Sequence, residues 1–214
     1  MTSPDPHLPV PRIAAIIPVG TLEGAKTRLA DTLDAEERHD LVTGLLTRTV
    51  VAALAVDRLG DVVVVSPDRE VLRLAADLGA RTLRQRSSGL NAGLIEARDD
   101  VVAGGAEAIL VVPVDLPFVT AGAIDALVDP LVASRSTVVL VTDRHATGTN
   151  VLGLRPPDAI DFAFGPGSRA AHRDRAAAAG ASFVEVDGPL GIDLDTPEDL
   201  VLIESTAPEG LGVG

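Results

Sequence analysis

The chain has 214 residues, of which 46% are apolar and 2% aromatic, and it carries 18 Lys and Arg against 31 Asp and Glu. This length and apolar content are typical of one α/β domain and exclude global disorder. The net charge of −13 and the scarcity of aromatic residues argue against nucleic acid or an anionic membrane as partner, and the absence of cysteine excludes disulfides and cysteine-bound metals.

Both ends of the chain are predicted to be tails. Residues 1–11 are rich in proline and show no basic stretch followed by an apolar one, and residues 205–214 look frayed. No apolar run approaches the roughly 20 residues that span a bilayer. We therefore expect one domain over 12–204, no membrane segment, and a cytoplasmic protein.

Short β-rich runs alternate with helical patterns along this domain. The predicted strands are 12–19, 61–66, 80–84, 108–114, 136–142, 150–154 and 182–186. Several are apolar at consecutive positions, which is typical of strands covered on both faces and predicts a mostly parallel sheet. The alternation predicts a three-layer α/β sandwich. Because the last two strands are irregularly spaced, we also expect an added β element or hairpin over the sheet.

Helix boundaries are marked by capping residues. Asp34 and Glu37 resemble a capping box before a helix at 35–56. A second helix is predicted to start at Ser66-Pro67 and to end at Gly79, because serine caps and proline suits the first turn. Further helices are predicted at about 91–103, after the Gly-Pro-Gly-Ser of 165–168, and from Thr196-Pro197 onward.

The first predicted strand leads into PVGTLEGAKTRLA (18–30), and ligands of such sheets bind at the carboxyl ends of the strands. The loop nearly fits a Walker A motif, but alanine replaces the second glycine and the next helix begins near Asp34. A Rossmann glycine motif is absent as well. Two interpretations remain: a loop that binds phosphate through Lys26 and Arg28, or an ordinary solvated loop.

Three aspartates lie at two other strand ends. Asp115 follows the strand at 108–114, and Asp193 and Asp195 are separated by one residue, so in extended chain they point to the same side. Carboxylates so close need a cation or a raised pKa, and Mg²⁺ prefers oxygen ligands. We interpret them as a Mg²⁺–triphosphate site. The alternatives are a turn capped by Asp115 and a solvated turn in which Asp195 or Thr196 caps the last helix.

Two loops, DRHATGTN (143–150) and FGPGSRAAHRDR (164–175), offer hydrogen-bond donors. In the first, two threonines, the second of them Thr149, flank a glycine. In the second, the Ser168 hydroxyl and free backbone N–H groups at a helix start form a candidate anion site. Positive charge is expected there from Arg169, His172 and Arg173. Each loop taken alone is also explained as a turn with favourable turn residues.

Taken in order, PVGTLEGAKTRLA, SGLNAGL (88–94), PVDLPFV, ATGTNVL, FGPGSRAAH and GIDLDTPEDL resemble the CofC/FbiD guanylyltransferases of deazaflavin coenzyme F(420) biosynthesis. The resemblance covers about 12–203 and implies a nucleotide-diphospho-sugar-transferase-like fold. It implies transfer of GMP from GTP to a phosphorylated three-carbon acid, with release of pyrophosphate. The acid is phosphoenolpyruvate in many bacterial members and 2-phospho-L-lactate in others, and the FGP.S pattern favours phosphoenolpyruvate.

The resemblance also implies roles for individual residues. Mg²⁺ would be bound by Asp115, Asp193 and Asp195. The GTP phosphates would lie near Lys26 and Arg28, which with Asp115 would be the catalytic residues. The guanine would lie near Leu90 and Asn91, and the acid would be held by Thr149, Gly165 and Ser168. Family members usually have lysine where this chain has Gly20, so one phosphate cation is missing.

The implied chemistry agrees with the residues. The nucleophile is a phosphate oxygen that is ionised at neutral pH, so no general base is needed. The task is to hold two anions in line, although unit charges ~4 Å apart repel by about 4 kcal/mol at an effective dielectric of about 20.

Several rivals to this function stay open. They are a related nucleotidyltransferase acting on a sugar phosphate or molybdopterin, a non-catalytic GTP-binding domain, and a P-loop GTPase. The expected partners are the two substrates and, through a transient contact, the downstream deazaflavin transferase. A homodimer is the working hypothesis for the oligomeric state.

Overall fold

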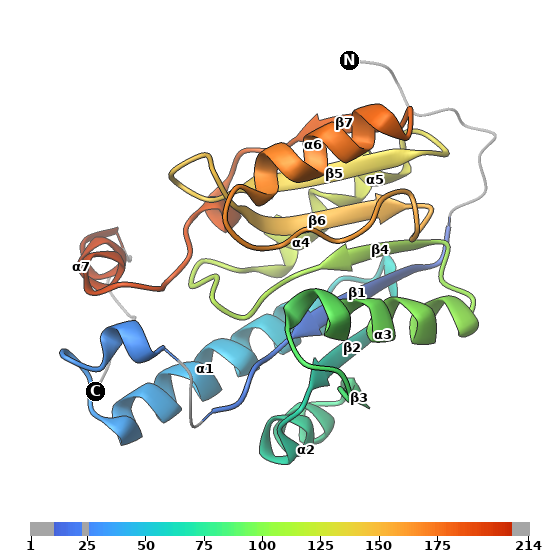
Figure 1. Ribbon diagram of the computed structural model, residues 1–214. Helices are drawn as coiled ribbons and strands as arrows, with labels where there is room; N and C mark the ends of the chain where they lie inside the picture. The colour runs from blue at the N-terminus through green and yellow to red at the C-terminus, as the bar shows by residue number, and fades with distance from the viewer. Residues whose placement is uncertain (1–10, 23–25, 207–214) are drawn as a thin grey trace.

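The computed structural model describes residues 11–22 and 26–206. Within these ranges seven strands form one sheet in the order β3-β2-β1-β4-β6-β5-β7 (Figure 1). Their bounds are β1 (Ile13–Pro18), β2 (Leu59–Ser66), β3 (Arg81–Arg84), β4 (Ala108–Val111), β5 (Thr137–Thr142), β6 (Thr149–Arg155) and β7 (Ser182–Glu185). All neighbouring strands run parallel except where β6 pairs with β4 and β5. The mostly parallel sheet predicted from the sequence is confirmed.

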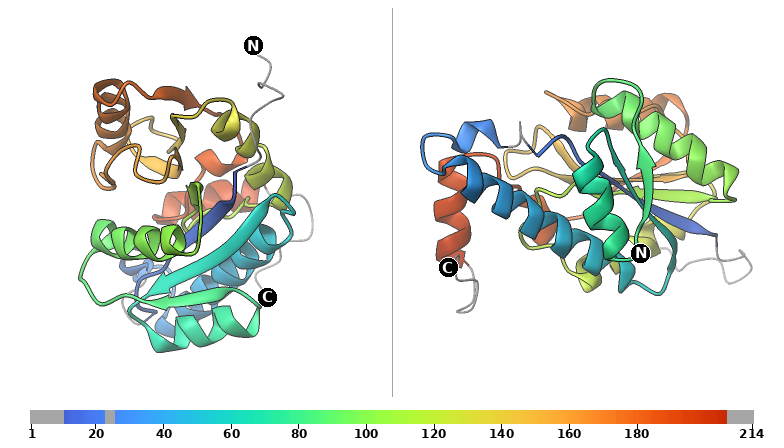
Figure 2. Two further views of the ribbon diagram at one scale, coloured as in Figure 1. Left: turned by 90° about the vertical axis from the view of Figure 1, so that its right-hand side faces the viewer. Right: turned by 90° about the horizontal axis from the view of Figure 1, so that it is seen from below.

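Helices cover both faces of the sheet (Figure 2). One face packs against α1 (Ala35–Leu54), α2 (Arg69–Asp77), α4 (Ala121–Asp125) and α5 (Val128–Val132), and the other against α3 (Leu90–Ala103) and α6 (Ser168–Ala178). Side chains of β1 alternate between the two cores, with Ile13 and Ile17 on the first face and Ile16 on the second. Since both faces are buried, consecutive apolar residues are favoured in this strand. The predicted three-layer sandwich is confirmed.

The helix starts show which capping predictions hold. Asp34 Oδ1 accepts a hydrogen bond from the Glu37 N–H at 2.9 Å, and Glu37 Oε2 accepts from the Asp34 N–H at 2.7 Å, so the capping box is confirmed. The predicted start of α2 at Ser66-Pro67 is wrong, because Asp68 is the N-cap. Ser66 ends β2, and its hydroxyl instead accepts from the Asp68 N–H at 3.0 Å. Gly79 follows α2 with a φ of 97°, as its predicted role in ending the helix requires.

The expectation of a β element over the sheet is wrong. β5 and β6 instead pair as antiparallel neighbours within the sheet. All but the first residue of β6 are buried, so its sequence is as apolar as that of a parallel strand and does not reveal its direction. The helices α4 and α5 were not predicted, because five residues each are too few to show a helical period.

The carboxyl ends of β1 and β4 and the start of β6 lie at one edge of the sheet. The segment after β1 contains η1 (Thr27–Leu29), and the segment after β7 contains η2 (Pro189–Gly191) and α7 (Pro197–Thr206). Of these, α7 stands apart from the sheet (Figures 1 and 2). No helix in the described part of the chain is long and apolar enough to cross a membrane. Apart from residues 11, 205 and 206, the two predicted tails lie outside the described residues.

Candidate active site

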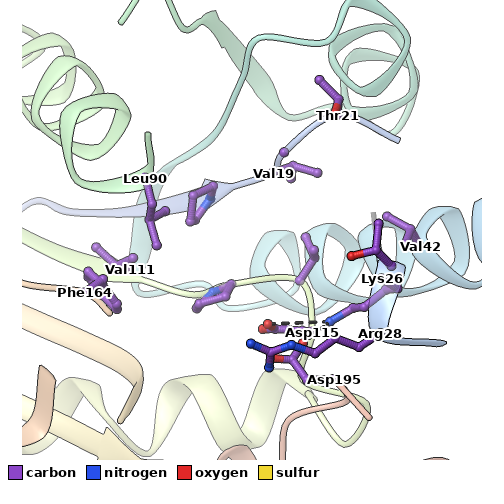
Figure 3. A pocket seen from close by; sticks show the side chains of 15 residues that line it. Val19, Thr21, Lys26, Arg28, Val42, Leu90, Val111, Asp115, Phe164 and Asp195 are labelled. Carbon is purple, nitrogen blue, oxygen red and sulfur yellow. Dashed lines mark hydrogen bonds and ion pairs between the residues drawn. The ribbon is translucent and has the colours of Figure 1, made fainter. Parts of the chain in front are cut away.

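A cavity of about 480 Å³ opens at the carboxyl ends of β1 and β4 (Figure 3). One end of it is charged and the other apolar. The charged end is lined by Lys26, Arg28, Asp115 and Asp195, and the apolar end by Leu90, Val111 and Phe164. Such a cavity suits a ligand that combines an anionic group with a flat, mostly apolar one.

Lys26 bridges two of the predicted metal ligands. Its ammonium nitrogen lies 2.7 Å from Oδ1 of Asp195 and 3.7 Å from Oδ2 of Asp115, and its side chain is 11% exposed. The residue has a left-handed backbone with a φ of 52°. Arg28 behaves differently, because its side chain is 75% exposed and its guanidinium reaches Asp195 only at 4.0 Å. The close cation at this end of the cavity is therefore Lys26.

Asp115 lies beyond β4 and is tied to the aspartate segment near the C-terminus. Its carbonyl oxygen accepts a hydrogen bond from the Leu194 N–H at 2.9 Å. Burial raises the pKa of the Asp115 carboxyl; Lys26 opposes that rise, and the charges of Asp195 and Asp193 add to it. Burial is also the main cause of the raised pKa of Asp193. These carboxylates therefore lack sufficient positive charge around them, which favours binding of a further cation.

Burial alternates along residues 193–195, as an extended segment requires. Leu194 between them is 2% exposed and packs inward, whereas both aspartates are partly exposed. Asp195 lines the cavity wall, and Asp193 acts on Asp115 through its charge. In residues 11–22 and 26–206, no three acidic or histidine side chains converge closely enough to hold a metal ion in this arrangement, in which Lys26 lies between two of the carboxylates.

Asp199 holds this segment in place, a role the sequence did not reveal. Its Oδ2 accepts hydrogen bonds from the backbone N–H groups of Asp195 and Thr196 and from the Thr196 hydroxyl, at 2.7–3.0 Å. Its Oδ1 lies 2.7 Å from the Arg144 guanidinium, and its side chain is 5% exposed. Burial alone would raise the pKa of Asp199, but these hydrogen bonds and Arg144 lower it overall. Asp199, an acid in the first turn of α7, is thus the anchor of Asp195.

The predicted acceptor residues lie beside the cavity and not on its wall. Thr149 is the first residue of β6, Ser168 is the first residue of α6 and is 2% exposed, and Gly165 has a φ of 130°. Among the described residues that line the cavity, Phe164 is the one that belongs to the same loop as Gly165 and Ser168. The loop therefore meets the apolar end of the cavity through Phe164.

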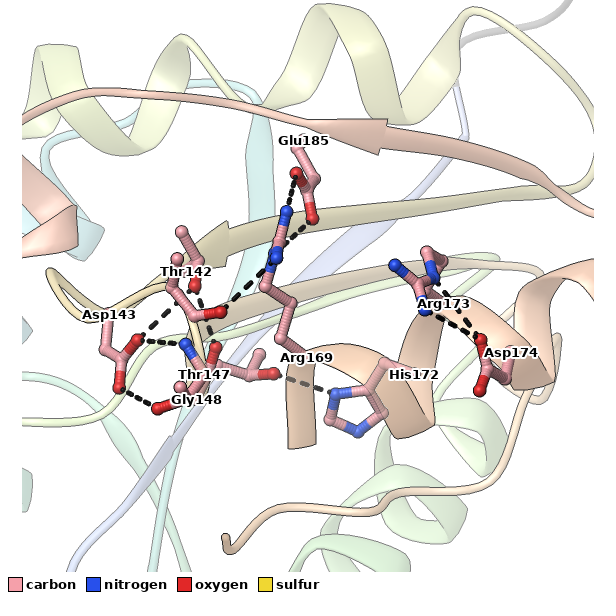
Figure 4. A network of polar contacts seen from close by, with 11 residues as sticks. Thr142, Asp143, Thr147, Gly148, Arg169, His172, Arg173, Asp174 and Glu185 are labelled. Atoms are coloured by element: carbon pink, nitrogen blue, oxygen red, sulfur yellow. Dashed lines mark hydrogen bonds and ion pairs between the residues drawn. The ribbon is translucent and has the colours of Figure 1, made fainter. Parts of the chain in front are cut away.

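The positive charge expected from this loop is largely not available. His172 is fully buried, and burial followed by the nearby charge of Arg175 lowers its pKa to about 4, so it is neutral at pH 7 and the prediction is wrong. Arg169 forms a two-point ion pair with Glu185, at 2.7 and 2.9 Å (Figure 4). Arg173 contacts Asp174 at 3.2 Å. An anion in this loop would therefore depend on neutral hydrogen-bond donors.

Comparison with known proteins identifies the family. Residues 13–205 match the family described as guanylyl transferase CofC like. The chain belongs to this family. It is 46% identical, over 92% of its own length and 94% of the relative, to a phosphoenolpyruvate guanylyltransferase of Sphaerobacter thermophilus. It is 30% identical, over 88% of its length and 81% of the relative, to a 2-phospho-L-lactate guanylyltransferase of Methanocaldococcus jannaschii.

A solved structure supports the fold. The chain superposes with a TM-score of 0.75, at 15% identity and over 92% of this chain and 89% of the other, on a crystal structure from Desulfovibrio desulfuricans described as a nucleotide-diphospho-sugar transferase. The fold implied by the resemblance is confirmed.

Two positions of the CofC-like pattern are clarified by the geometry. A Cβ atom on Gly20 would meet no atom within 4 Å, so the cavity wall has open space at the position where the resemblance implies a lysine. Asn91 lies next to the cavity-lining Leu90, but its amide is already used: Nδ2 donates to the Phe164 carbonyl at 3.0 Å and Oδ1 accepts from the Phe164 N–H at 2.9 Å. Leu90 is 45% exposed and free to contact a base.

Proposed function

We propose that this protein transfers GMP from GTP to phosphoenolpyruvate, releasing pyrophosphate and forming enolpyruvoyl-2-diphospho-5'-guanosine for coenzyme F(420) biosynthesis. The observation that carries the proposal is the cavity in which Lys26 lies between Asp115 and Asp195 at one end and Leu90 and Phe164 lie at the other. We assign the guanine to the apolar end and the triphosphate to the charged end. The name of the Sphaerobacter relative supports the choice of acceptor.

Lys26 is proposed to stabilise the charge that develops during the transfer. An oxygen of the acceptor phosphate attacks the α-phosphorus of GTP, and the bond to the bridging oxygen breaks, so that pyrophosphate leaves with the electron pair. The barrier lies mainly in bringing two anions together, and a fixed cation in a partly enclosed site lowers it more than a mobile ion in water would. The ammonium of Lys26 is the best-held cation at the charged end, because its side chain is 11% exposed.

Mg²⁺ is the proposed cofactor. The donors at this end are carboxylate oxygens, and the burial that raises the pKa of Asp115 and Asp193 is offset when a divalent cation binds beside them. Asp115, Asp193 and Asp195 would hold the ion, which supplies positive charge that reduces repulsion between the phosphates. Asp199 would keep Asp195 in position through the backbone of residues 195–196.

The acceptor is proposed to bind next to the nucleotide, between β6 and the start of α6. Thr149, Gly165 and Ser168 would orient it so that its phosphate oxygen is in line with the leaving pyrophosphate. No side chain has to remove a proton, because the phosphate nucleophile is already ionised at neutral pH. We place the reaction in the cytoplasm, where GTP is available.

The test is a coupled assay with purified protein, GTP and Mg²⁺. Phosphoenolpyruvate or 2-phospho-L-lactate is added together with the downstream deazaflavin transferase and its acceptor, and pyrophosphate and the deazaflavin product are followed by mass. We expect pyrophosphate and a dehydro-type product with phosphoenolpyruvate. Turnover with 2-phospho-L-lactate alone would reassign the acceptor. If neither acid leads to release of pyrophosphate, the proposal is overturned. Release of inorganic phosphate would indicate a GTPase.

Chelation tests the metal in the same assay. Addition of EDTA should stop pyrophosphate release, and excess Mg²⁺ should restore it. Undiminished turnover after exhaustive chelation would show that Lys26 and Arg28 suffice without a metal ion.

A further inference from the structure

The ring of His172 lies buried where three segments meet, and both of its nitrogens have partners. Nδ1 lies 3.0 Å from the hydroxyl oxygen of Thr149, at the start of β6. Nε2 accepts a hydrogen bond from the Ala163 N–H at 2.9 Å. The ring also packs edge-on against Phe164, with centroids 5.2 Å apart. The side chain is fully buried, so no solvent competes for these contacts.

The contact with Ala163 decides which nitrogen carries the proton. A backbone N–H can only donate, so Nε2 must present its lone pair to it. A neutral imidazole has one protonated nitrogen, which is then Nδ1. The Nδ1–H therefore donates to the Thr149 hydroxyl oxygen. The hydroxyl accepts in this contact and does not donate its own proton to His172. The charged ring would place two donors face to face at Ala163, in agreement with the pKa near 4.

The hydroxyl proton of Thr149 is consequently left free for a ligand. Within the described ranges, the hydroxyl of Thr149 makes no hydrogen bond other than that with His172. Thr147, the other threonine of the loop, is committed, since its hydroxyl donates to Asp143 at 3.2 Å (Figure 4). Of the two threonines, Thr149 alone can donate to an incoming anion.

We propose that His172 is a positioning residue that holds the Thr149 hydroxyl as a hydrogen-bond donor to the anionic acceptor substrate. The inference rests on the proposed function, because it assumes that the acceptor binds at Thr149. It explains how an anion is recognised in a loop where Arg169 is paired with Glu185 and Arg173 with Asp174. A neutral donor whose direction is fixed replaces a free cation.

The charged group that faces this histidine supports the assignment. Arg175, one turn along α6, directs its guanidinium to the carbonyl oxygens of Asp161 and Phe162, both at 2.8 Å. Its charge, added to burial, opposes protonation of the ring. The ring therefore stays neutral throughout the neutral pH range, and the Ala163 N–H keeps its proton on Nδ1.

The tautomer can be tested without any substrate. NMR of isotope-labelled histidine distinguishes a protonated from an unprotonated ring nitrogen. At pH 7 we expect His172 to carry its proton on Nδ1, with Nε2 unprotonated. A proton on Nε2, or a charged ring, would overturn the inference whether or not the protein transfers GMP.

Kinetics test the role of the hydroxyl with matched variants. His172→Gln can still accept from Ala163 but loses the donor to Thr149, whereas His172→Asn keeps a donor near the Nδ1 position. Thr149→Val removes the hydroxyl in the same shape, and Thr149→Ser keeps it. We expect Thr149→Val and His172→Gln to raise the KM for the acceptor about 10- to 100-fold, as loss of a hydrogen bond to a charged group does. The KM for GTP should be unchanged, and His172→Asn and Thr149→Ser should be affected less.

The double variant separates positioning from general support of the fold. If His172 acts through Thr149, adding His172→Gln to Thr149→Val should raise the acceptor KM no further. If the two substitutions instead raise the acceptor KM independently, so that their effects multiply, the inference is overturned. A normal acceptor KM in Thr149→Val would overturn it as well. Neither result would contradict the proposed GMP transfer. A wild-type protein that uses neither acid would instead overturn the proposed function.

Discussion

The Lys26 ammonium and the Asp195 carboxylate lie 2.7 Å apart, although 169 positions separate them in the chain. The sequence assigned Lys26 to the nucleotide phosphates and Asp195 to a metal ion, as two separate tasks. The structure places them in direct contact, with Asp115 at 3.7 Å from the same ammonium. A cation that enters between these carboxylates would release Lys26 toward the phosphates, so we expect the two tasks to be coupled.

The first prediction concerns the two cations of the loop after β1. Lys26→Met should lower kcat/KM for GMP transfer at least ~100-fold, because a fixed charge near the phosphates is lost in a partly enclosed site. Arg28→Met should have a smaller effect, since the Arg28 side chain is 75% exposed and its charge is screened. Steady-state kinetics of both variants check this. An equal or larger loss in Arg28→Met would contradict the ranking.

The second prediction concerns Asp115. Asp115→Asn should fold, because the amide has the same shape as the carboxylate and carries no charge. It therefore avoids the cost of burying a charge, which raises the pKa of the Asp115 carboxyl. Loss of the contact with Lys26 at 3.7 Å works against that gain, so we expect the unfolding free energy to change by no more than about 1 kcal/mol. Turnover should fall to the background rate. Asp99→Asn is the control, since the Asp99 side chain is 70% exposed. Wild-type activity in Asp115→Asn would contradict the assignment of Asp115 to the metal.

The third prediction concerns Asp199, which touches no cavity wall. Asp199→Asn weakens a buried ion pair with Arg144 and turns part of its acceptor capacity into donor groups, so we expect a loss of about 1–3 kcal/mol in unfolding free energy. It should also reduce kcat about tenfold or more, because Asp195 loses a backbone anchor. Glu198→Gln, an exposed change in the same helical turn, should do neither. Destabilisation with full activity would show that Asp195 is placed without this anchor.

Local patterns in the sequence were enough for the fold class. Strands β1, β2 and β4 are apolar at consecutive positions because helices bury both of their faces, and that pattern is visible without a structure. The direction of β6 was not visible, since burial gives it the same composition as its parallel neighbours. The capping box at Asp34 was readable because both partners lie within four residues.

The residues of the candidate site could be predicted from the sequence only in part, for a related reason. Residue types at strand ends indicated Lys26, Asp115 and Asp195, and these do converge. Asp199 anchors Asp195 through local hydrogen bonds, but its ion pair with Arg144 comes from a distant loop, and its position in a helix start suggested only a first-turn acid. The neutral state of His172 depends on burial by segments far along the chain, while its neighbours in sequence are arginines.

The fourth prediction is a pH dependence of stability. The folded protein keeps His172 neutral down to a pKa of about 4, whereas the unfolded chain protonates it near the ordinary value of 6.5. Below pH 6.5 the unfolded state therefore binds more protons, and the unfolding free energy falls as the pH falls. Between pH 7 and 4.5 this contributes a loss of about 2–3 kcal/mol. Urea unfolding of wild type and His172→Gln should show a shallower pH dependence in the variant; parallel curves would contradict the lowered pKa.

The last prediction separates two roles for Asn91. If its amide reads guanine, as the resemblance implies, Asn91→Ala should raise the KM for GTP. The structure instead commits both amide atoms to the backbone of Phe164, which begins the loop of the proposed acceptor site. We therefore expect Asn91→Ala to raise the acceptor KM about tenfold or more, with a smaller change for GTP, because two hydrogen bonds that fix the loop are lost. Asn91→Asp is the matched variant: it can still accept from the Phe164 N–H but faces the Phe164 carbonyl with a charge, so it should resemble Asn91→Ala. A rise confined to the KM for GTP in both variants would show that Asn91 leaves Phe164 when the nucleotide binds.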